Sequence, residues 1–224
     1  MERAYRGVGY VLFALPLVMV AGFWVPYFSG FPHFGKDVTP AVHVHALVQF
    51  TWVALAVAQP LAIGAGAYRT HRLLGRLSYF LAPLIVLFAG AMIVKEYGEH
   101  RAEGMSAAAA FRAEYLSYTV LPALAALYLL AIRRIRKGDA AGHMRYMICI
   151  AVALSPAGIG RVLGYFFDVR LRSAMTASLL LVDAAFLGLI LYDRARGASP
   201  RPYAVALLTY LAIEAGWLAL GRPA

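Results

Sequence analysis

Seven long apolar stretches alternate with short polar tracts along the 224 residues of the chain. Each stretch has about 20 residues, which is the length that an α-helix needs to cross the hydrocarbon core of a bilayer. The predicted spans cover residues 8–27, 43–65, 73–95, 115–132, 145–167, 175–192 and 203–220. Backbone groups in lipid must pair within their own segment, so these spans are predicted to be helices. Transmembrane strands would instead be runs of about ten residues with alternating polarity.

The composition places the chain in lipid rather than in water. Hydrophobic residues make up 62% of the chain and charged residues 14%, whereas an ordinary soluble domain has roughly 25% charged residues. A soluble chain of this length has too much surface to bury that much apolar material. We therefore predict one all-α transmembrane bundle over residues 1–224, with no separate soluble domain. The run 8–27 is too long for the core of a signal peptide and is predicted to remain as the first helix.

Short basic tracts between the spans predict the orientation of the chain. With the N-terminus inside, 13 Lys and Arg residues fall on the inner side and 7 on the outer side. The inner set is Arg3, Arg6, Arg69, Arg72, Arg76, Arg133, Arg134, Arg136, Lys137, Arg145, Arg194, Arg196 and Arg201; the outer set is Lys36, Lys95, Arg101, Arg112, Arg170, Arg172 and Arg222. The positive-inside rule then predicts N-in and C-out. Anionic lipid headgroups account for the net charge of +10, so no nucleic-acid partner is expected.

Three charged residues lie well inside predicted spans, where an ionised side chain is costly and usually functional. Asp183 lies near the midplane, while Arg161 and Glu214 lie roughly 7 and 5 Å toward the outer face at 1.5 Å rise per residue. An ion pair between Arg161 and Asp183 is within reach, either as a functional pair or as one that only stabilises the bundle. Glu214 has no evident partner, and our hypothesis is that its carboxyl carries a proton.

The second span has a polar stripe on one helical face. Its members, spaced by four, three and seven residues, are His45, Gln49, Trp52 and Gln59. Such a stripe is expected to face other helices or a watery cavity rather than lipid. One hypothesis is a polar pocket that opens outward and includes His45, Gln49, Arg161, Glu214, Tyr165 and Tyr210. The alternative is that these groups only hydrogen-bond neighbouring helices together.

The histidines raise the question of haem, because a membrane b-type haem takes one axial histidine from each of two helices. His71 and His143 both lie on the predicted inner side beside arginines, and Arg72, Arg76 and Arg145 are candidates to meet the propionates. On the outer side, His45 with His43 or His100 is a second candidate pair. Loop histidines can also simply cap helices or meet lipid headgroups, and this alternative stays open.

Other chemistry finds little support in the sequence. Cys149 is the only cysteine and lies in an apolar segment, so neither an intramolecular disulfide nor a cysteine-based metal site is predicted. No phosphate-binding loop, H-E-x-x-H pair or nucleophile elbow is present. We therefore assign no catalytic residue and no metal site. The fourth helix is predicted to start early, at the alanine run before residue 115, with Ser106 as its N-cap.

Two tracts carry a resemblance to a known group. HRLLGRLSY (71–79) and HMRYM (143–147) resemble the H-R-x-L-G-R and H-x-R-x-M motifs of an uncharacterised family of bacterial multi-pass membrane proteins. HVHALVQFTW (43–52) and GIGRV (158–162) add to the likeness, which covers roughly residues 40–165. The resemblance implies a bacterial cytoplasmic (inner) membrane protein and supplies no established activity. More distantly, paired histidines at helix ends are similar to those of cytochrome b-type electron carriers, although helix-centred pairs are missing here.

Three functional hypotheses follow from these residues. The first is a redox carrier that binds haem b through His71 and His143, with His45 as a further candidate ligand. The second is a proton-coupled small-molecule transporter that uses Arg161, Asp183 and Glu214. The third is a non-catalytic accessory or assembly subunit, for which a second copy or a membrane partner would be required. All three place the protein in a lipid bilayer.

Overall fold

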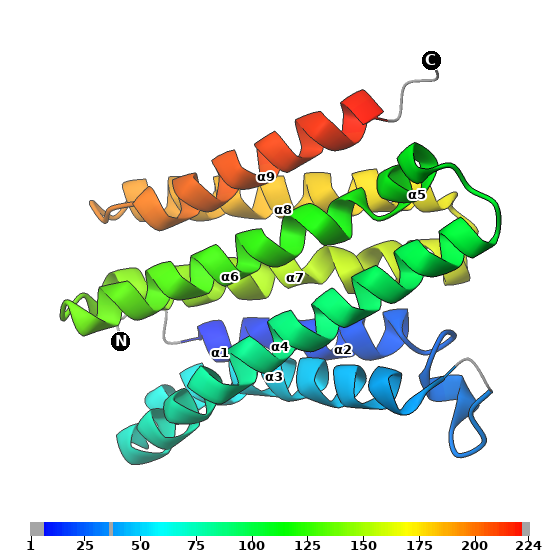
Figure 1. Ribbon diagram of the computed structural model, residues 1–224. Helices are drawn as coiled ribbons and strands as arrows, with labels where there is room; N and C mark the ends of the chain where they lie inside the picture. The colour runs from blue at the N-terminus through cyan, green and yellow to red at the C-terminus, as the bar shows by residue number, and fades with distance from the viewer. Residues whose placement is uncertain (1–6, 36–37, 221–224) are drawn as a thin grey trace.

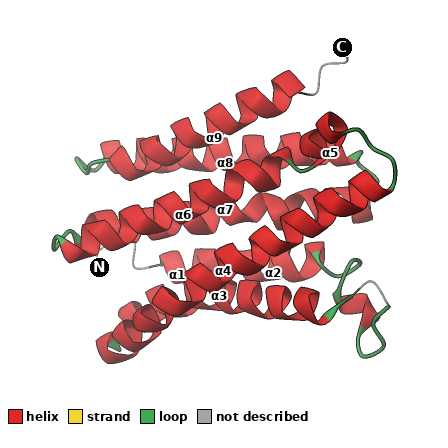
Figure 2. Cartoon of the chain, in the orientation of Figure 1, coloured by secondary structure: helices red, strands yellow, loops and turns green. Residues whose placement is uncertain are grey.

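The computed structural model describes residues 7–35 and 38–220, and all regular secondary structure in these ranges is helical (Figure 2). Its elements are α1 (Val8–Leu12), α2 (Ala14–Gly22), the 3-10 helix η2 (Phe28–Gly30), α3 (Pro40–Gly64), α4 (Tyr68–Ala102), α5 (Ala107–Ala113), α6 (Tyr115–Arg136), α7 (Ala140–Phe167), α8 (Leu171–Arg194) and α9 (Arg201–Leu220). The all-α prediction is confirmed for these residues. Four cations of the predicted topology, Arg3, Arg6, Lys36 and Arg222, lie outside the described ranges.

Six of the described helices, α3, α4, α6, α7, α8 and α9, are long and apolar enough to cross a membrane. They correspond to the second to seventh predicted spans, and the chain is accordingly a multi-pass membrane protein. The first predicted span, 8–27, is represented by a shorter apolar segment, Val8–Gly22, in which Phe13 separates α1 from α2. Helix α4 extends furthest beyond its predicted span, 73–95, since it has 35 residues and a length of about 52 Å.

Helix α7 is the central element of the bundle. It packs against α2, α3, α6, α8 and α9, and buried residues recur along it from Gly142 to Gly160. The α3–α4 hairpin and the α1–α2 segment lie on one side of α7, and the α8–α9 hairpin lies on the other (Figure 1). Helix α6 bridges these groups because it contacts α4, α7 and α9.

The connections divide the bundle into two ends. The turns from α3 to α4, from α6 to α7 and from α8 to α9 share one end, which we call the arginine-rich end (Figure 1). Each of these tight turns contains a glycine with positive φ, namely Gly66, Gly138 and Gly197, a conformation that other residues adopt at a cost. The opposite, acidic end holds Glu96, Glu99, Glu103 and Glu114. There Ser106 Oγ accepts from Ala109 N–H at 3.2 Å, so the predicted cap is confirmed. The helix that it begins, α5, ends at Ala113 and is separated from α6 by Glu114, so it is not an early start of the fourth spanning helix.

The α1–α2 segment packs directly on α7 because two glycines face each other. A Cβ atom added to Gly22 would lie 2.8 Å from the Gly158 Cα, and one added to Gly158 would lie 2.9 Å from the carbonyl oxygen of Val18. Only hydrogen in place of a side chain permits this approach of two helix backbones. Gly158 lies in the GIGRV tract that was noted in the sequence, so its role there is packing.

We expect Gly158→Ala to destabilise the protein by about 1–3 kcal/mol, because the added methyl group meets backbone that cannot move aside. Gly188→Ala is the matched control, since a Cβ at Gly188 in α8 has no atom within 4 Å. Thermal unfolding in detergent should show a lower midpoint for Gly158→Ala and an almost unchanged midpoint for Gly188→Ala. Equal midpoints for the two variants would contradict the packing described above.

Candidate functional site

His71 and His143 lie near each other at the arginine-rich end. His71 is in the first turn of α4 and His143 in the first turn of α7, and both helices begin at this end. The two imidazole rings are close enough for their charges to interact, and both side chains are half-buried. The chain therefore brings together two histidines that are 72 residues apart in sequence.

Each ring has a protein contact at its Nδ1 atom. His143 Nδ1 lies 3.0 Å from the carbonyl oxygen of Ala131 in α6, which can only accept a hydrogen bond. His71 Nδ1 contacts the side-chain amide of Gln59 in α3. When the Gln59 amide is oriented so that both its nitrogen and its oxygen have partners, the nitrogen also donates to the His71 carbonyl at 3.2 Å. The oxygen then accepts from Gly75 N–H at 2.7 Å. Gln59 thus belongs to this histidine site, a role that the stripe on the second span did not indicate.

An apolar groove of about 610 Å³ lies between α3, α4, α6 and α7. Its lining includes Trp52, Tyr79, Leu124, Tyr128, Ile150 and Leu154. His71 shares a face of α4 with Ala82, eleven residues on, and His143 shares a face of α7 with Ile150, seven residues on. Both Ala82 and Ile150 line the groove, so the two histidines lie beyond its arginine-rich end. Arg136 also lines it.

The groove separates Gln49 of the polar stripe from the other residues of the predicted outward pocket. Gln49 and Trp52 line the groove, and the Trp52 ring packs edge-on against Tyr128 with centroids 5.4 Å apart. The Tyr128 hydroxyl in turn lies 2.9 Å from Ser78 Oγ. Gln49 therefore faces α4 and α6 rather than a shared pocket with Glu214.

Arg145 of α7 and Asp193 of α8 form a buried ion pair at the arginine-rich end. Arg145 Nε lies 2.6 Å from Asp193 Oδ2 and Arg145 Nη2 lies 3.1 Å from Oδ1, so the contact is bidentate. The side chains are only 4% and 1% exposed. Arg145, which the sequence offered as a partner for haem propionates, therefore has Asp193 at its guanidinium. Asp193 was not among the predicted site residues, although an acid in the last turn of a span among arginines was a usable signal.

Arg161 is held at the other end of the bundle by different contacts. Its guanidinium carbon lies 4.4 Å from the centroid of the Phe23 ring, a cation–π contact, and its Nη1 donates to the Ala157 carbonyl at 2.8 Å. The hypothesised ion pair with Asp183 is not formed between these described residues. Arg161 instead lies within electrostatic range of His45, as well as of Glu96 and Glu114 at the acidic end.

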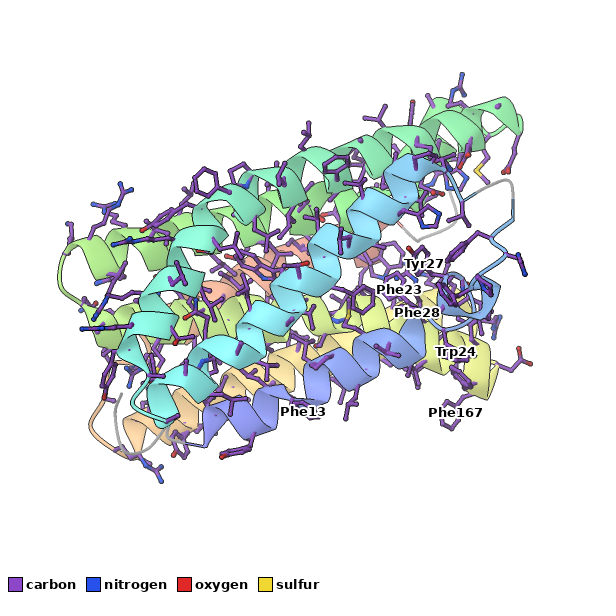
Figure 3. All side chains as sticks on the ribbon, turned by 90° about the horizontal axis from the view of Figure 1, so that it is seen from below. Phe13, Phe23, Trp24, Tyr27, Phe28 and Phe167 are labelled. Carbon is purple, nitrogen blue, oxygen red and sulfur yellow. The ribbon has the colours of Figure 1, made fainter. Side chains whose placement is uncertain are left out.

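His45 therefore belongs to the acidic end and lies far from His71 and His143. Its Nδ1 atom is buried without a hydrogen-bond partner. The two histidines that were considered as its haem-binding partners are engaged elsewhere, since His43 Nδ1 lies 2.8 Å from the Tyr27 hydroxyl and His100 Nε2 lies 3.3 Å from a Glu114 carboxyl oxygen. Figure 3 shows Phe23, Tyr27 and Phe28 gathered at this end, where such aromatic side chains suit a membrane interface.

Asp183 and Glu214 meet each other across the interface of α8 and α9. Tyr210, one turn before Glu214, is fully buried and donates its hydroxyl to the Ala153 carbonyl at 2.7 Å. The polar residues that the sequence analysis joined into one outward pocket thus divide into three places. These are the groove with Gln49, the acidic end with His45 and Arg161, and the carboxyl pair with Tyr210.

No family model matches this chain, and neither the curated proteins nor the solved structures contain a match. Within residues 7–35 and 38–220 there is also no group of three or more His, Cys, Asp or Glu side chains suited to a metal ion.

Removing one partner of the Arg145–Asp193 pair should destabilise the bundle strongly. We expect Arg145→Leu to cost about 3–5 kcal/mol, because it leaves a buried carboxylate without its counter-charge. Combining Arg145→Leu with Asp193→Leu should recover much of that loss, since no isolated charge then remains. Thermal unfolding in detergent measures both effects. Arg194→Leu, an exposed neighbour, is the control and should change stability by about 0.5 kcal/mol or less; a comparable loss there would contradict the assignment.

Proposed function

We propose that this protein is a membrane redox carrier that binds a b-type haem between His71 and His143. The observation that supports the proposal best is the electrostatic interaction between these two imidazoles, which lie in the first turns of two helices that begin at the same end of the bundle. His71 and His143 would hold the haem iron, which would supply one-electron chemistry. The chemistry of electron transfer would come from the iron, while the protein would hold and orient its ligands.

The environment of His143 suits an iron ligand. Histidines that bind metals usually donate Nδ1–H to a carbonyl or carboxylate, which fixes the tautomer and leaves Nε2 free for the metal. His143 has this arrangement, because the Ala131 carbonyl lies 3.0 Å from its Nδ1. The neutral ring then presents an unprotonated Nε2.

Gln59 controls the tautomer of His71. When the Gln59 amide nitrogen faces Nδ1, as the bond with Gly75 N–H requires, Nδ1 accepts and the ring proton is on Nε2. Ligation through Nε2 requires the opposite tautomer, in which Nδ1–H donates to the amide oxygen. A half-turn of the Gln59 amide provides that acceptor, at the expense of its bond with Gly75 N–H. Haem binding would therefore be coupled to the orientation of this one side chain.

The surroundings of the two histidines also suit haem. The groove lined by Trp52, Tyr128 and Ile150 supplies apolar surface about two helical turns further along α4 and α7 from the pair. Arg72 and Arg76 in the first turns of α4 are exposed, and Arg136 lines the groove. These three cations remain as candidates for the propionates, since Arg145 is bound to Asp193.

The haem proposal predicts an optical signature that depends on His143. Protein produced with a haem supply and purified in detergent should show a reduced-minus-oxidised Soret shift with one haem per chain. His143→Ala should lower haem occupancy by about tenfold or more, because an axial ligand is lost. The control is His33→Ala, in an exposed segment at the acidic end. Intact wild-type protein with no Soret shift after incubation with haem would overturn the proposal.

A second arm of this experiment separates ligation from general folding effects. Gln59→Glu places a carboxylate against Nδ1 of His71, which would favour the Nδ1–H tautomer and make Nε2 a stronger ligand. We expect this variant to keep its haem and to shift the midpoint potential in the negative direction. An unchanged potential would exclude His71 as the second ligand while leaving His143 in place.

We further propose that the chain crosses the membrane seven times, with its N-terminus and the arginine-rich end facing the cytoplasm of a bacterium. The α1–α2 segment would be the first crossing, and the asymmetry of the basic tracts supports the direction. The resemblance of residues 71–79 and 143–147 to a family of bacterial inner-membrane proteins supports the location.

Single-cysteine labelling in intact cells tests the orientation. The native Cys149 is fully buried, so Glu103→Cys and Ser199→Cys each introduce one exposed thiol at opposite ends. A membrane-impermeant maleimide should label Glu103→Cys in intact cells, and Ser199→Cys only after the cells are opened. The reverse pattern would place the arginine-rich end outside.

A further inference from the structure

Asp183 and Glu214 form a contact that the haem proposal does not use. Asp183 is halfway along α8, and Glu214 faces it from α9, the helix beside it at the edge of the bundle (Figure 1). The two carboxyl groups are within hydrogen-bonding distance of each other. Glu214 is only 9% exposed. One oxygen of each carboxyl, Asp183 Oδ1 and Glu214 Oε1, is completely buried and has no hydrogen-bond partner.

No cation among the described residues neutralises this pair. The arginine of α8 on the same side, Arg172, stacks over the Trp217 ring at 4.7 Å and donates to the Trp217 carbonyl at 3.0 Å. Arg161 of α7 lies over Phe23. No salt bridge joins either carboxyl to a Lys, Arg or His side chain of the described ranges.

The titratable groups that the neighbouring helices present to the pair are tyrosines. Tyr210 of α9 lies close to both carboxyls, but its hydroxyl proton is already donated to Ala153 of α7. Helix α6 places Tyr115 against Gly216 of α9, half a turn beyond Glu214. A tyrosine hydroxyl is neutral at ordinary pH, so neither residue supplies a counter-charge.

Two carboxylates in contact within an apolar bundle cannot both remain ionised, because like charges at this distance repel strongly. One shared proton replaces that repulsion with a charge-assisted O–H···O⁻ hydrogen bond. We propose that Asp183 and Glu214 form a proton-binding site that holds one proton between the two carboxyls within the membrane. The oxygens without partners, Asp183 Oδ1 and Glu214 Oε1, are the acceptors to which this proton can move.

This site is independent of the proposed haem site. The carboxyl pair joins α8 to α9, whereas the groove and the histidine pair lie among α3, α4, α6 and α7. Helix α7 separates the two places. The proton site can therefore exist in a protein that binds no haem, and an experiment that reports on carboxyl protonation does not depend on redox activity.

Dicyclohexylcarbodiimide tests the proposal directly, because it enters apolar regions and reacts with protonated carboxyl groups. The carboxyl proton moves to a carbodiimide nitrogen, the carboxyl oxygen adds to the central carbon, and an acyl shift leaves a stable N-acylurea. We expect one adduct per chain on Asp183 or Glu214, located by peptide mass spectrometry of the detergent-purified protein. Labelling should fall by about tenfold per pH unit above the pH at which the shared proton is lost.

The variants Asp183→Asn and Glu214→Gln test whether the two carboxyls share one proton. In Asp183→Asn the amide donates to the Glu214 carboxylate and no longer repels it, so Glu214 should lose its proton more readily. Labelling of Glu214 at neutral pH should then drop about tenfold or more, and the double variant should not be labelled at all. Glu103→Gln, an exposed carboxyl at the acidic end, is the control and should label as the wild type does. Elution as a single monodisperse species verifies that each variant is folded.

Three results would overturn the proposal. The first is folded wild-type protein without an adduct on either residue at any pH. The second is unchanged labelling of Glu214 in Asp183→Asn, which would mean that the two carboxyls titrate separately. The third is protection by sodium ions at constant pH, which would identify a site for a monovalent metal ion. None of these results bears on the Soret shift, so the two proposals fail separately.

Discussion

Lipid tails offer no hydrogen-bond partner, so each polar side chain between the helices has to find one in the protein. The ion pair of Arg145 with Asp193 meets this constraint most completely, because two charges satisfy each other through a bidentate contact that excludes solvent. It ties α7 to α8 at the end where three hairpin turns converge.

Helix α7 connects this ion pair to the rest of the bundle through its contacts with other helices. Its start holds His143 against α6 and near His71, its middle accepts α2 through Gly158, and its Ala153 carbonyl fixes Tyr210 beside the carboxyl pair. Two separate groups of polar side chains are thereby placed on opposite sides of one helix. A histidine pair beside an apolar groove suits a cofactor, while a carboxyl pair without a counter-charge suits a proton. The common cause is that α7 contacts almost every other long helix.

The positions of the helices followed from apolar length alone, because the bilayer requires about 20 residues per crossing. Residues 43–65 and 145–167 were predicted within a few positions of α3 and α7. The prediction was least accurate where the chain continues as helix beyond the apolar run, as α4 does to Ala102. The first predicted span, 8–27, was also longer than the Val8–Gly22 segment, because Phe13 and the residues after Gly22 leave the helix. A helix can form in water as well as in lipid, so hydropathy does not show at which residue a helix begins or ends.

By itself the sequence determined the class of the protein, its helical architecture and the residues worth examining, since burial in lipid makes any charge or imidazole conspicuous. Only the tertiary structure decided which of these residues are partners. The depths of Arg161 and Asp183 in the bilayer are compatible with an ion pair. Depth does not determine how each helix is rotated about its axis or which helices are neighbours. Those two quantities follow from side-chain packing, and they assigned Arg145 to Asp193, Gln59 to His71 and Asp183 to Glu214.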